Sequence, residues 1–147
     1  GADASHIYAP ASGSVGYEPS AGSNGGLTAI DIATGEKTWY VAADTPVCSW
    51  GESNCRGSQT APPLVIPGVV FSGSEDGHMR AYASDDGRVI WDFDTGKNFP
   101  SVNTDEATGA TILTGQSVSG GKLFVNSGRG FTGQPGNALL VFSVDGK

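Results

Sequence analysis

The chain has 147 residues, 23 of them glycine, and a formal net charge of −7. Its length suits one domain with a hydrophobic core. The acidic balance argues against binding to nucleic acid, which needs clustered lysines and arginines, and no apolar run approaches the roughly 18 residues of a membrane helix. The acidic residues of the expected turns are interpreted as solubilising surface groups, namely Glu75, Asp76, Asp85 and Asp86.

The apolar residues form short clusters rich in Val, Ile, Phe and Tyr, without helical periodicity, which predicts an all-β chain. The first expected strands are residues 5–11 and the two halves of "LTAIDIATGEKTWYV", residues 27–41. In that hairpin Asp31 is expected to accept hydrogen bonds from the turn at Thr34 and Gly35, where glycine permits a positive φ. Trp39 is expected to pack flat against a neighbouring sheet.

Two cysteines follow in the stretch "CSWGESNC". Cys48 and Cys55 lie in a loop rich in Gly, Ser and Asn, which favours a disulfide and an oxidising compartment over the alternative of two free thiols. Trp50 lies between them, and it either packs under the loop or contributes to an aromatic platform. The spacing does not match a haem-attachment or a zinc motif.

The hairpin then recurs 52 residues later in "MRAYASDDGRVIWDF", with Gly87 and Trp91 in the places of Gly35 and Trp39. This middle unit predicts four strands, at residues 61–66, 69–74, 78–83 and 88–93. Within it, Arg80 is interpreted as a cross-strand or inter-sheet partner and His78 as a surface histidine without a partner.

A third unit predicts strands at residues 111–118, 122–128 and 137–144. Repeats of roughly 40–50 residues built from short strands are typical of a β-propeller, in which each repeat is one four-stranded antiparallel blade. The fold class is therefore an all-β partial propeller of about three blades, the first without its first strand and the last without its fourth. The units are residues 1–41, 60–94 and 110–147 of a single domain. Three incomplete blades do not close a ring, so the remaining blades of a longer chain or further copies of this chain are the expected partners.

Long and short connections alternate along these units. The turns between strands one and two and between strands three and four of each blade are all tight. The long loops at residues 12–25, 42–59, 95–109 and 128–136 are connections of the other kind and are expected on the opposite face, where only the connection at residues 75–77 is short. Long loops gathered at one end of a rigid scaffold are where binding and chemistry usually occur. We therefore expect the functional face there.

The repeated residues resemble a known family. Ala29, Asp31, Thr34, Gly35 and Trp39 match the blade signature A-x-D-x-x-T-G-x-x-x-W of the quinoprotein dehydrogenases, which carry pyrroloquinoline quinone (PQQ) in a β-propeller. The second copy departs from it at the positions of the Asp and the Thr. The elements "WDFDT", "VNSG" and "PGN" further resemble the C-terminal blades of polyvinyl-alcohol-dehydrogenase-like quinoproteins.

The resemblance implies a site and an activity. It implies PQQ with Ca²⁺, bound near Asn103, Asn126 and Arg129, with Asp105 and Glu106 as further oxygen donors; the alternative is a pair of solvated loops. The implied reaction is oxidation of an alcohol by hydride transfer to the quinone, with a cytochrome c as electron acceptor, in the periplasm or outside the cell. The catalytic base is not placed within the chain. The alternative function is a non-catalytic PQQ-like repeat protein that acts as a binding or self-assembling scaffold.

Overall fold

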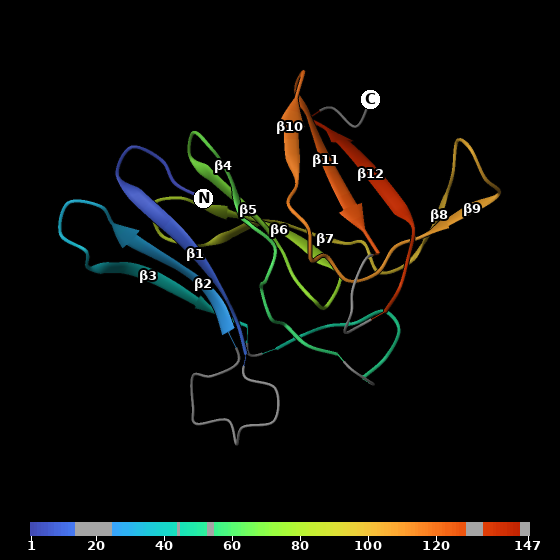
Figure 1. Ribbon diagram of the computed structural model, residues 1–147, viewed down its shortest axis with the longest axis horizontal. Helices are drawn as coiled ribbons and strands as arrows, with labels where there is room; N and C mark the ends of the chain where they lie inside the picture. Colours follow the sequence, from blue (N-terminus) through green and yellow to red (C-terminus); the bar gives the residue numbers. More distant parts are fainter. Residues whose placement is uncertain (14–24, 44, 53–54, 129–133, 145–147) are drawn as a thin grey trace.

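A computed structural model of the chain describes residues 1–13, 25–43, 45–52, 55–128 and 134–144. These ranges contain twelve strands and no helix (Figure 1). The strands form one four-stranded sheet, two three-stranded sheets and one two-stranded hairpin, all antiparallel (Figure 1). The expected all-β class and the division into sheets of three, four and three strands are confirmed.

The first sheet has the order β1-β2-β3. Its strands are β1 (His6–Ser12), β2 (Gly25–Asp31) and β3 (Lys37–Ala42). An isolated bridge joins Ala2 to Ile7, so the first residues of the chain lie along the other edge of β1.

The second sheet has the order β4-β5-β6-β7. The first strand, expected from residue 61, begins only at Leu64, since the two preceding prolines have no amide hydrogen to donate to a neighbouring strand. The other three strands agree with the sequence expectation to within one residue. The four are β4 (Leu64–Ile66), β5 (Val69–Gly73), β6 (His78–Ala83) and β7 (Val89–Asp94).

The third sheet has the order β10-β11-β12 and comprises β10 (Ser117–Ser119), β11 (Lys122–Ser127) and β12 (Ala138–Ser143). The first of these was expected over residues 111–118 and is much shorter. The preceding residues turn instead toward the second sheet, where the Ile112 amide donates to the Ser74 carbonyl at 3.1 Å.

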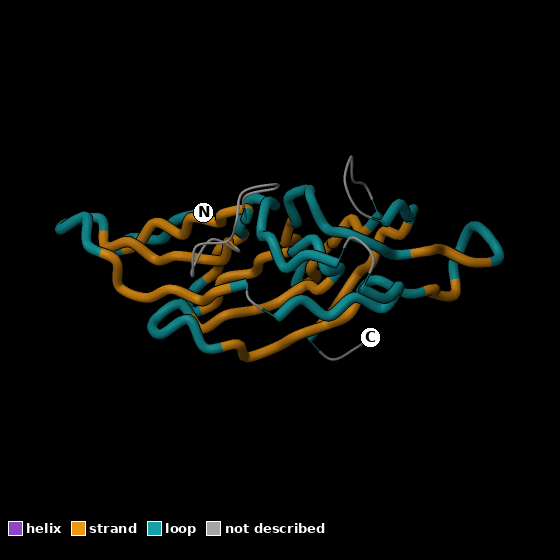
Figure 2. Tube along the Cα trace, turned by 90° about the horizontal axis from the view of Figure 1, so that it is seen from below, coloured by secondary structure: helices purple, strands orange, loops and turns teal. Residues whose placement is uncertain are grey.

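A further hairpin, β8 (Asn98–Pro100) with β9 (Glu106–Thr108), lies within the segment expected to be a loop. It projects from one end of the molecule (Figure 2). Phe99 stacks on Phe93 of β7 with ring centroids 6.2 Å apart, and the Lys97 ammonium lies 5.9 Å from the Phe99 ring. This aromatic packing is a tertiary contact that the local sequence pattern did not reveal.

Apolar side chains fill the two joints between successive sheets. The first core cluster joins the first sheet to the second through Tyr8, Leu27, Ala29, Trp39, Val70 and Tyr82. The second joins the second sheet to the third through Ala61, Met79, Ile112, Leu123 and Val125. Each sheet therefore buries a face against the next one, as in successive propeller blades.

The hairpin that repeats in the sequence has a structural role: its turn is held by local hydrogen bonds, and its tryptophan packs at the joint with the next sheet. Asp31 Oδ1 accepts a hydrogen bond from the Thr34 amide at 2.8 Å, and Gly35 has a φ of 74°. Trp39 is 8% exposed, and its indole N–H donates at 3.0 Å to the carbonyl of Ser84, in the turn between β6 and β7 of the second sheet. Trp91 packs its ring edge-on with Phe142 of the third sheet, 5.2 Å between centroids.

Some of the loop residues meet at one end of the sheets. The Gln59 amide donates to the Ala11 carbonyl at 3.3 Å, and the Gly13 amide donates to Ser58 Oγ at 3.2 Å. Residues 14–24 and 129–133 lie outside the described residues, so the placement of all four long loops on one face stays a prediction. No helix in the described part of the chain is long and apolar enough to cross a membrane.

Candidate functional site

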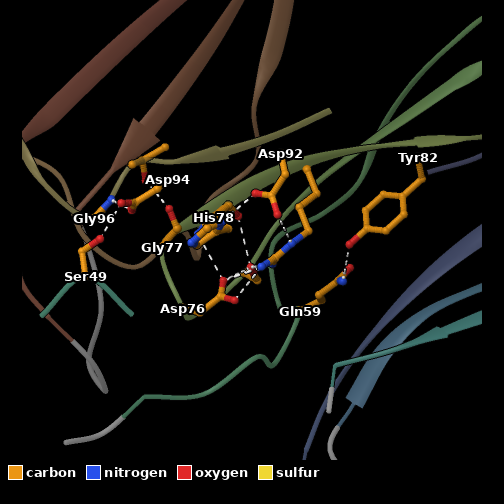
Figure 3. A network of polar contacts seen from close by, with 12 residues as sticks. Ser49, Gln59, Asp76, Gly77, His78, Tyr82, Asp92, Asp94 and Gly96 are labelled. Atoms are coloured by element: carbon orange, nitrogen blue, oxygen red, sulfur yellow. Dashed lines mark hydrogen bonds and ion pairs between the residues drawn. The ribbon is translucent and has the colours of Figure 1, made fainter. Parts of the chain in front are cut away.

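A buried ionic network lies between the β5–β6 turn and strand β6 (Figure 3). The side chain of Asp76 is 1% exposed, and its Oδ2 lies 2.8 Å from Nη2 of Arg80. Ser74 Oγ donates to the same carboxylate and in turn accepts a hydrogen bond from Arg80 Nη1 at 2.7 Å. The His78 amide donates to Asp76 Oδ1 at 3.1 Å. The carboxylate therefore has a charged partner and several hydrogen-bond donors.

A second carboxylate completes the pairing of Arg80. Asp92 faces it across the β6–β7 ladder, and its Oδ2 lies 3.1 Å from Arg80 Nε. The expectation that Arg80 is a cross-strand partner is confirmed. Burial alone raises the pKa of Asp76, but hydrogen bonds and charge attraction from Arg80 outweigh it and hold that pKa below its ordinary value. Burial lowers the pKa of Arg80, and the two aspartates more than reverse that effect.

His78 was expected to be a surface histidine without a partner, and this was wrong. Its side chain is 13% exposed, and Nδ1 lies 2.5 Å from Oδ1 of Asp92. The partner is 14 residues away in sequence and becomes a neighbour only when β6 and β7 pair.

The turn residues Glu75 and Asp76 were interpreted as solubilising groups, and this too was wrong. They are 8% and 1% exposed, whereas Asp85 and Asp86 are exposed as expected. Burial raises the pKa of Glu75, and Arg56 partly offsets that rise. The opposite charges of Asp76 and Arg80 four positions apart were the one signal in the sequence that could have identified the buried pair.

A neutral hydrogen-bond chain lies beside the ionic network. Ser72 Oγ donates to Gln59 Oε1 at 2.7 Å, and Gln59 Nε2 donates to the Tyr82 hydroxyl at 2.9 Å. Burial raises the pKa of Tyr82. This chain attaches the loop that contains Gln59 to the inner strands of the second sheet.

These groups border a cleft of about 220 Å³ between the first two sheets. Asp76, Arg80 and Tyr82 line one side, and Val41, Ala42, Ala43, Thr45, Pro46, Gly57 and Val89 complete the wall. Because Arg80 and the hydrogen-bond donors around it hold the pKa of Asp76 below its ordinary value, this carboxylate is a weaker base than a free aspartate. The arrangement is suited to bracing the joint between the sheets.

The predicted disulfide between Cys48 and Cys55 is present, with Cα atoms 5.7 Å apart. It closes the loop that carries Trp50, whose ring covers two glycines, so that a Cβ at Gly77 or Gly96 would lie 3.0 or 2.7 Å from it. The Trp50 indole nitrogen is buried, and it has no hydrogen-bond partner among the described residues. Ser49 Oγ donates to Asp94, which fastens the loop to the end of β7.

The residues that the resemblance suggested for the cofactor are not brought together by any contact in the described part of the chain. Asn103 is exposed in the β8–β9 turn, where its Oδ1 accepts a hydrogen bond from Ser101 at 2.8 Å. Asn126 is exposed on β11 opposite Leu139, and Arg129 lies outside the described residues. Asp105 and Glu106 are exposed beside Asn103.

The donors that are described do not by themselves fit a calcium site. Calcium is held by six to eight oxygens converging on one point. Among the described residues, no three His, Cys, Asp or Glu side chains are grouped so that they could hold a metal ion. No catalytic step is therefore assigned to Asn103, Asp105 or Glu106.

Comparison with known proteins places this geometry in a family. Residues 4–135 match the PQQ_2 family, described as outer membrane protein assembly factor BamB. The chain is 39% identical over 135 residues to a polyvinylalcohol dehydrogenase of Sphingopyxis sp. (strain 113P3), covering 83% of this chain and 21% of that protein. It is 33% identical to a polyvinylalcohol dehydrogenase of Pseudomonas sp., covering 99% of this chain and 24% of that protein. The chain thus spans less than a quarter of the length of these relatives.

Solved structures show the same fold. BamB from Moraxella catarrhalis superposes with a TM-score of 0.55 at 22% identity, over 83% of this chain and 33% of its own. A europium-containing methanol dehydrogenase superposes with a TM-score of 0.58 at 14% identity, over 98% of this chain and 22% of its own. The resemblance to PQQ-type propellers is confirmed: the chain belongs to the PQQ_2 family of β-propeller repeats described as outer membrane protein assembly factor BamB.

Proposed function

We propose that the chain forms three blades of a quinoprotein alcohol dehydrogenase-like propeller, which oxidises an alcohol by hydride transfer to PQQ. The observation that carries the proposal is the 39% identity to a polyvinylalcohol dehydrogenase across 83% of the chain. Structures of a quinohemoprotein alcohol dehydrogenase and a methanol dehydrogenase share the fold, with TM-scores of 0.55 and 0.58. An alcohol, and polyvinyl alcohol in particular, is the substrate class that the relatives' names suggest.

In this proposal the described residues mainly build and brace the scaffold. The Asp76–Arg80–Asp92 network holds the β5–β6 turn, β6 and β7 of the second sheet together. The disulfide closes the loop that contains Cys48 and Cys55. Asn103, Asn126 and Arg129 are proposed to reach PQQ or Ca²⁺ once further blades surround them. The catalytic base is proposed to lie in those blades.

The disulfide supports a periplasmic or extracellular location, because such bonds persist in oxidising compartments. A cytochrome c is proposed as the electron acceptor, since a reduced quinone must be reoxidised between turnovers.

The test is an assay of the complete propeller protein loaded with PQQ and Ca²⁺. Reduction of an artificial electron acceptor should depend on polyvinyl alcohol or a simple secondary alcohol, and on PQQ. A folded protein that binds no PQQ and reduces no acceptor with any alcohol would overturn the proposal.

A second candidate function is a non-catalytic scaffold. It is favoured by the match of residues 4–135 to the family described as an outer membrane protein assembly factor, and by the likeness to BamB itself. The same preparation distinguishes the two candidates. A scaffold is expected to fold fully without PQQ and to show no change in unfolding midpoint when PQQ is added.

A further inference from the structure

Residues 56–59, which follow the disulfide-closed loop, connect the first sheet to the second. The Gln59 amide donates to the Ala11 carbonyl of β1 at 3.3 Å, and the Glu75 amide of the β5–β6 turn donates to the Ser58 carbonyl at 2.9 Å. Ser58 and Gln59 are buried, 6% and 3% exposed. We refer to residues 56–59 as the clasp, because its two backbone hydrogen bonds reach one sheet each.

The turn that the clasp contacts carries a buried carboxyl group. Glu75 is 8% exposed, and its carboxylate receives no hydrogen bond and no ion pair from the described residues. Arg56, at the start of the clasp, attracts it without forming an ion pair. The neighbouring Asp76 differs, because Arg80 pairs with it. Since an unpaired charge is costly to bury, the neutral form of Glu75 suits this position better than the ionised form.

We propose that Glu75 makes the clasp sensitive to pH: the clasp is held while this carboxyl is protonated, and it loosens when the carboxyl ionises. The ionised group is hydrated, or comes into full contact with Arg56, only when the turn or the clasp moves.

The direction of the pH dependence follows from the burial of Glu75. Burial raises its pKa above the ordinary value of 4.5, and Arg56 partly offsets the rise. Because folding raises this pKa, the stability of the closed clasp is fully present below the unfolded-state value and is lost as pH rises through the folded-state value. This direction is opposite to that of Asp76, whose pKa is lowered by folding.

Other ionisable groups lie near the same turn, and the test has to separate them from Glu75. Asp76 is paired with Arg80, and His78 lies against Asp92. His78 can also take up a proton in the range around neutral pH. A substitution at Glu75 leaves all four of these groups in place, so it isolates the contribution of Glu75.

Loosening of the clasp has a consequence for the cleft between the first two sheets. Gly57 of the clasp and Asp76 of the turn both line that cleft. A clasp that moves away from the turn therefore opens the cleft from this side. The device needs no cofactor, so its test is independent of the proposed dehydrogenase activity.

The test is hydrogen exchange of the complete propeller protein, followed by mass spectrometry between about pH 4.5 and pH 8. The reporters are the amides of Glu75 and Gln59, and their protection is corrected for the intrinsic exchange rate at each pH. Protection should fall with rising pH, by about tenfold for each unit by which burial raises the pKa of Glu75. The Gly87 amide, bonded to the Ala83 carbonyl at the opposite end of β6, is the internal reference and should not change. Constant protection of both reporters across this range would overturn the proposal.

Three variants assign the effect. Glu75→Gln keeps the size of the side chain and removes its ionisation, so protection of the reporters should become independent of pH. Arg56→Ala should match the wild type at low pH and lose more protection at high pH, because the cation that favours the ionised form is gone. Glu36→Gln removes the same charge from the exposed β2–β3 turn and should behave like the wild type. A wild-type pH dependence in Glu75→Gln would assign the effect to another group, such as His78, and would contradict the proposal.

Discussion

The guanidinium of Arg80 lies 2.8 Å from the Oδ2 atom of Asp76, and the Asp76 side chain is 1% exposed. The pair joins the β5–β6 turn to strand β6, and Asp92 extends it to β7. A buried charge that loses its partner is costly, whereas an exposed pair contributes little. The loss of unfolding free energy when this pair is broken therefore measures how strongly the network stabilises the second sheet.

Asp76→Asn should lower the free energy of unfolding by about 3 kcal/mol, because it removes the charge that neutralises buried Arg80. Urea unfolding followed by tryptophan fluorescence measures the change. Asp86→Asn is the matched control, since Asp86 lies 3.7 Å from Arg88 in a pair whose side chains are 55% and 67% exposed. It should change the free energy by less than about 0.5 kcal/mol. Equal effects of the two substitutions would show that Asp76 does not brace the sheet.

The same carboxylate should make stability depend on pH. Folding lowers the pKa of Asp76 below its ordinary value of 3.8. A group of this kind stabilises the fold above its unfolded-state pKa, and that contribution is lost as pH falls through the folded-state pKa. The difference in unfolding free energy between wild type and Asp76→Asn should therefore be largest at neutral pH and shrink below pH 4, in the urea experiment repeated across pH. A difference that is constant with pH would contradict this linkage.

The strands were predictable where apolar residues alternate, and β6 was predicted with its observed bounds, residues 78–83. The repeat with its turn glycines predicted the succession of sheets. The site was less predictable, because buried Asp76 and exposed Asp86 are both aspartates in short turns and differ only in what packs over them. The His78–Asp92 contact depends on strand pairing, and the β8–β9 hairpin depends on the stacking of Phe99 on Phe93.

Two glycines related by the repeat provide a matched pair. Gly35 and Gly87 both have a φ of 74°, but a Cβ at Gly35 would meet no atom within 4 Å, whereas at Gly87 it would lie 2.7 Å from the Trp39 ring. Gly35→Ala should cost about 1 kcal/mol from backbone conformation alone. Gly87→Ala should cost about 1–3 kcal/mol more, because it displaces a packed indole. Urea unfolding measures both, and equal costs would show that the indole moves freely.

Removal of the disulfide should destabilise the fold. The bond between Cys48 and Cys55 spans a sequence separation of seven residues. Closing a loop of this size restricts the unfolded chain by about 2–3 kcal/mol at 25 °C. The double variant Cys48→Ser, Cys55→Ser should unfold at correspondingly lower urea, and dithiothreitol should lower the midpoint of the wild type but not of the variant. An unchanged wild-type midpoint after verified reduction would contradict this.

Three side chains are predicted to contact the cofactor, and their substitution tests that prediction. In the complete propeller protein, Arg129→Ala should weaken PQQ binding by about tenfold or more, because a hydrogen bond to a charged group contributes roughly 1.5–3 kcal/mol. Asn103→Ala and Asn126→Ala should have smaller effects, since a neutral hydrogen bond contributes about 1 kcal/mol. Equilibrium titration monitored by quinone absorbance measures the affinity. Arg88→Ala is the control, because the Arg88 side chain is 67% exposed in a tight turn. An affinity that is unchanged in all three variants would move the cofactor site away from these loops.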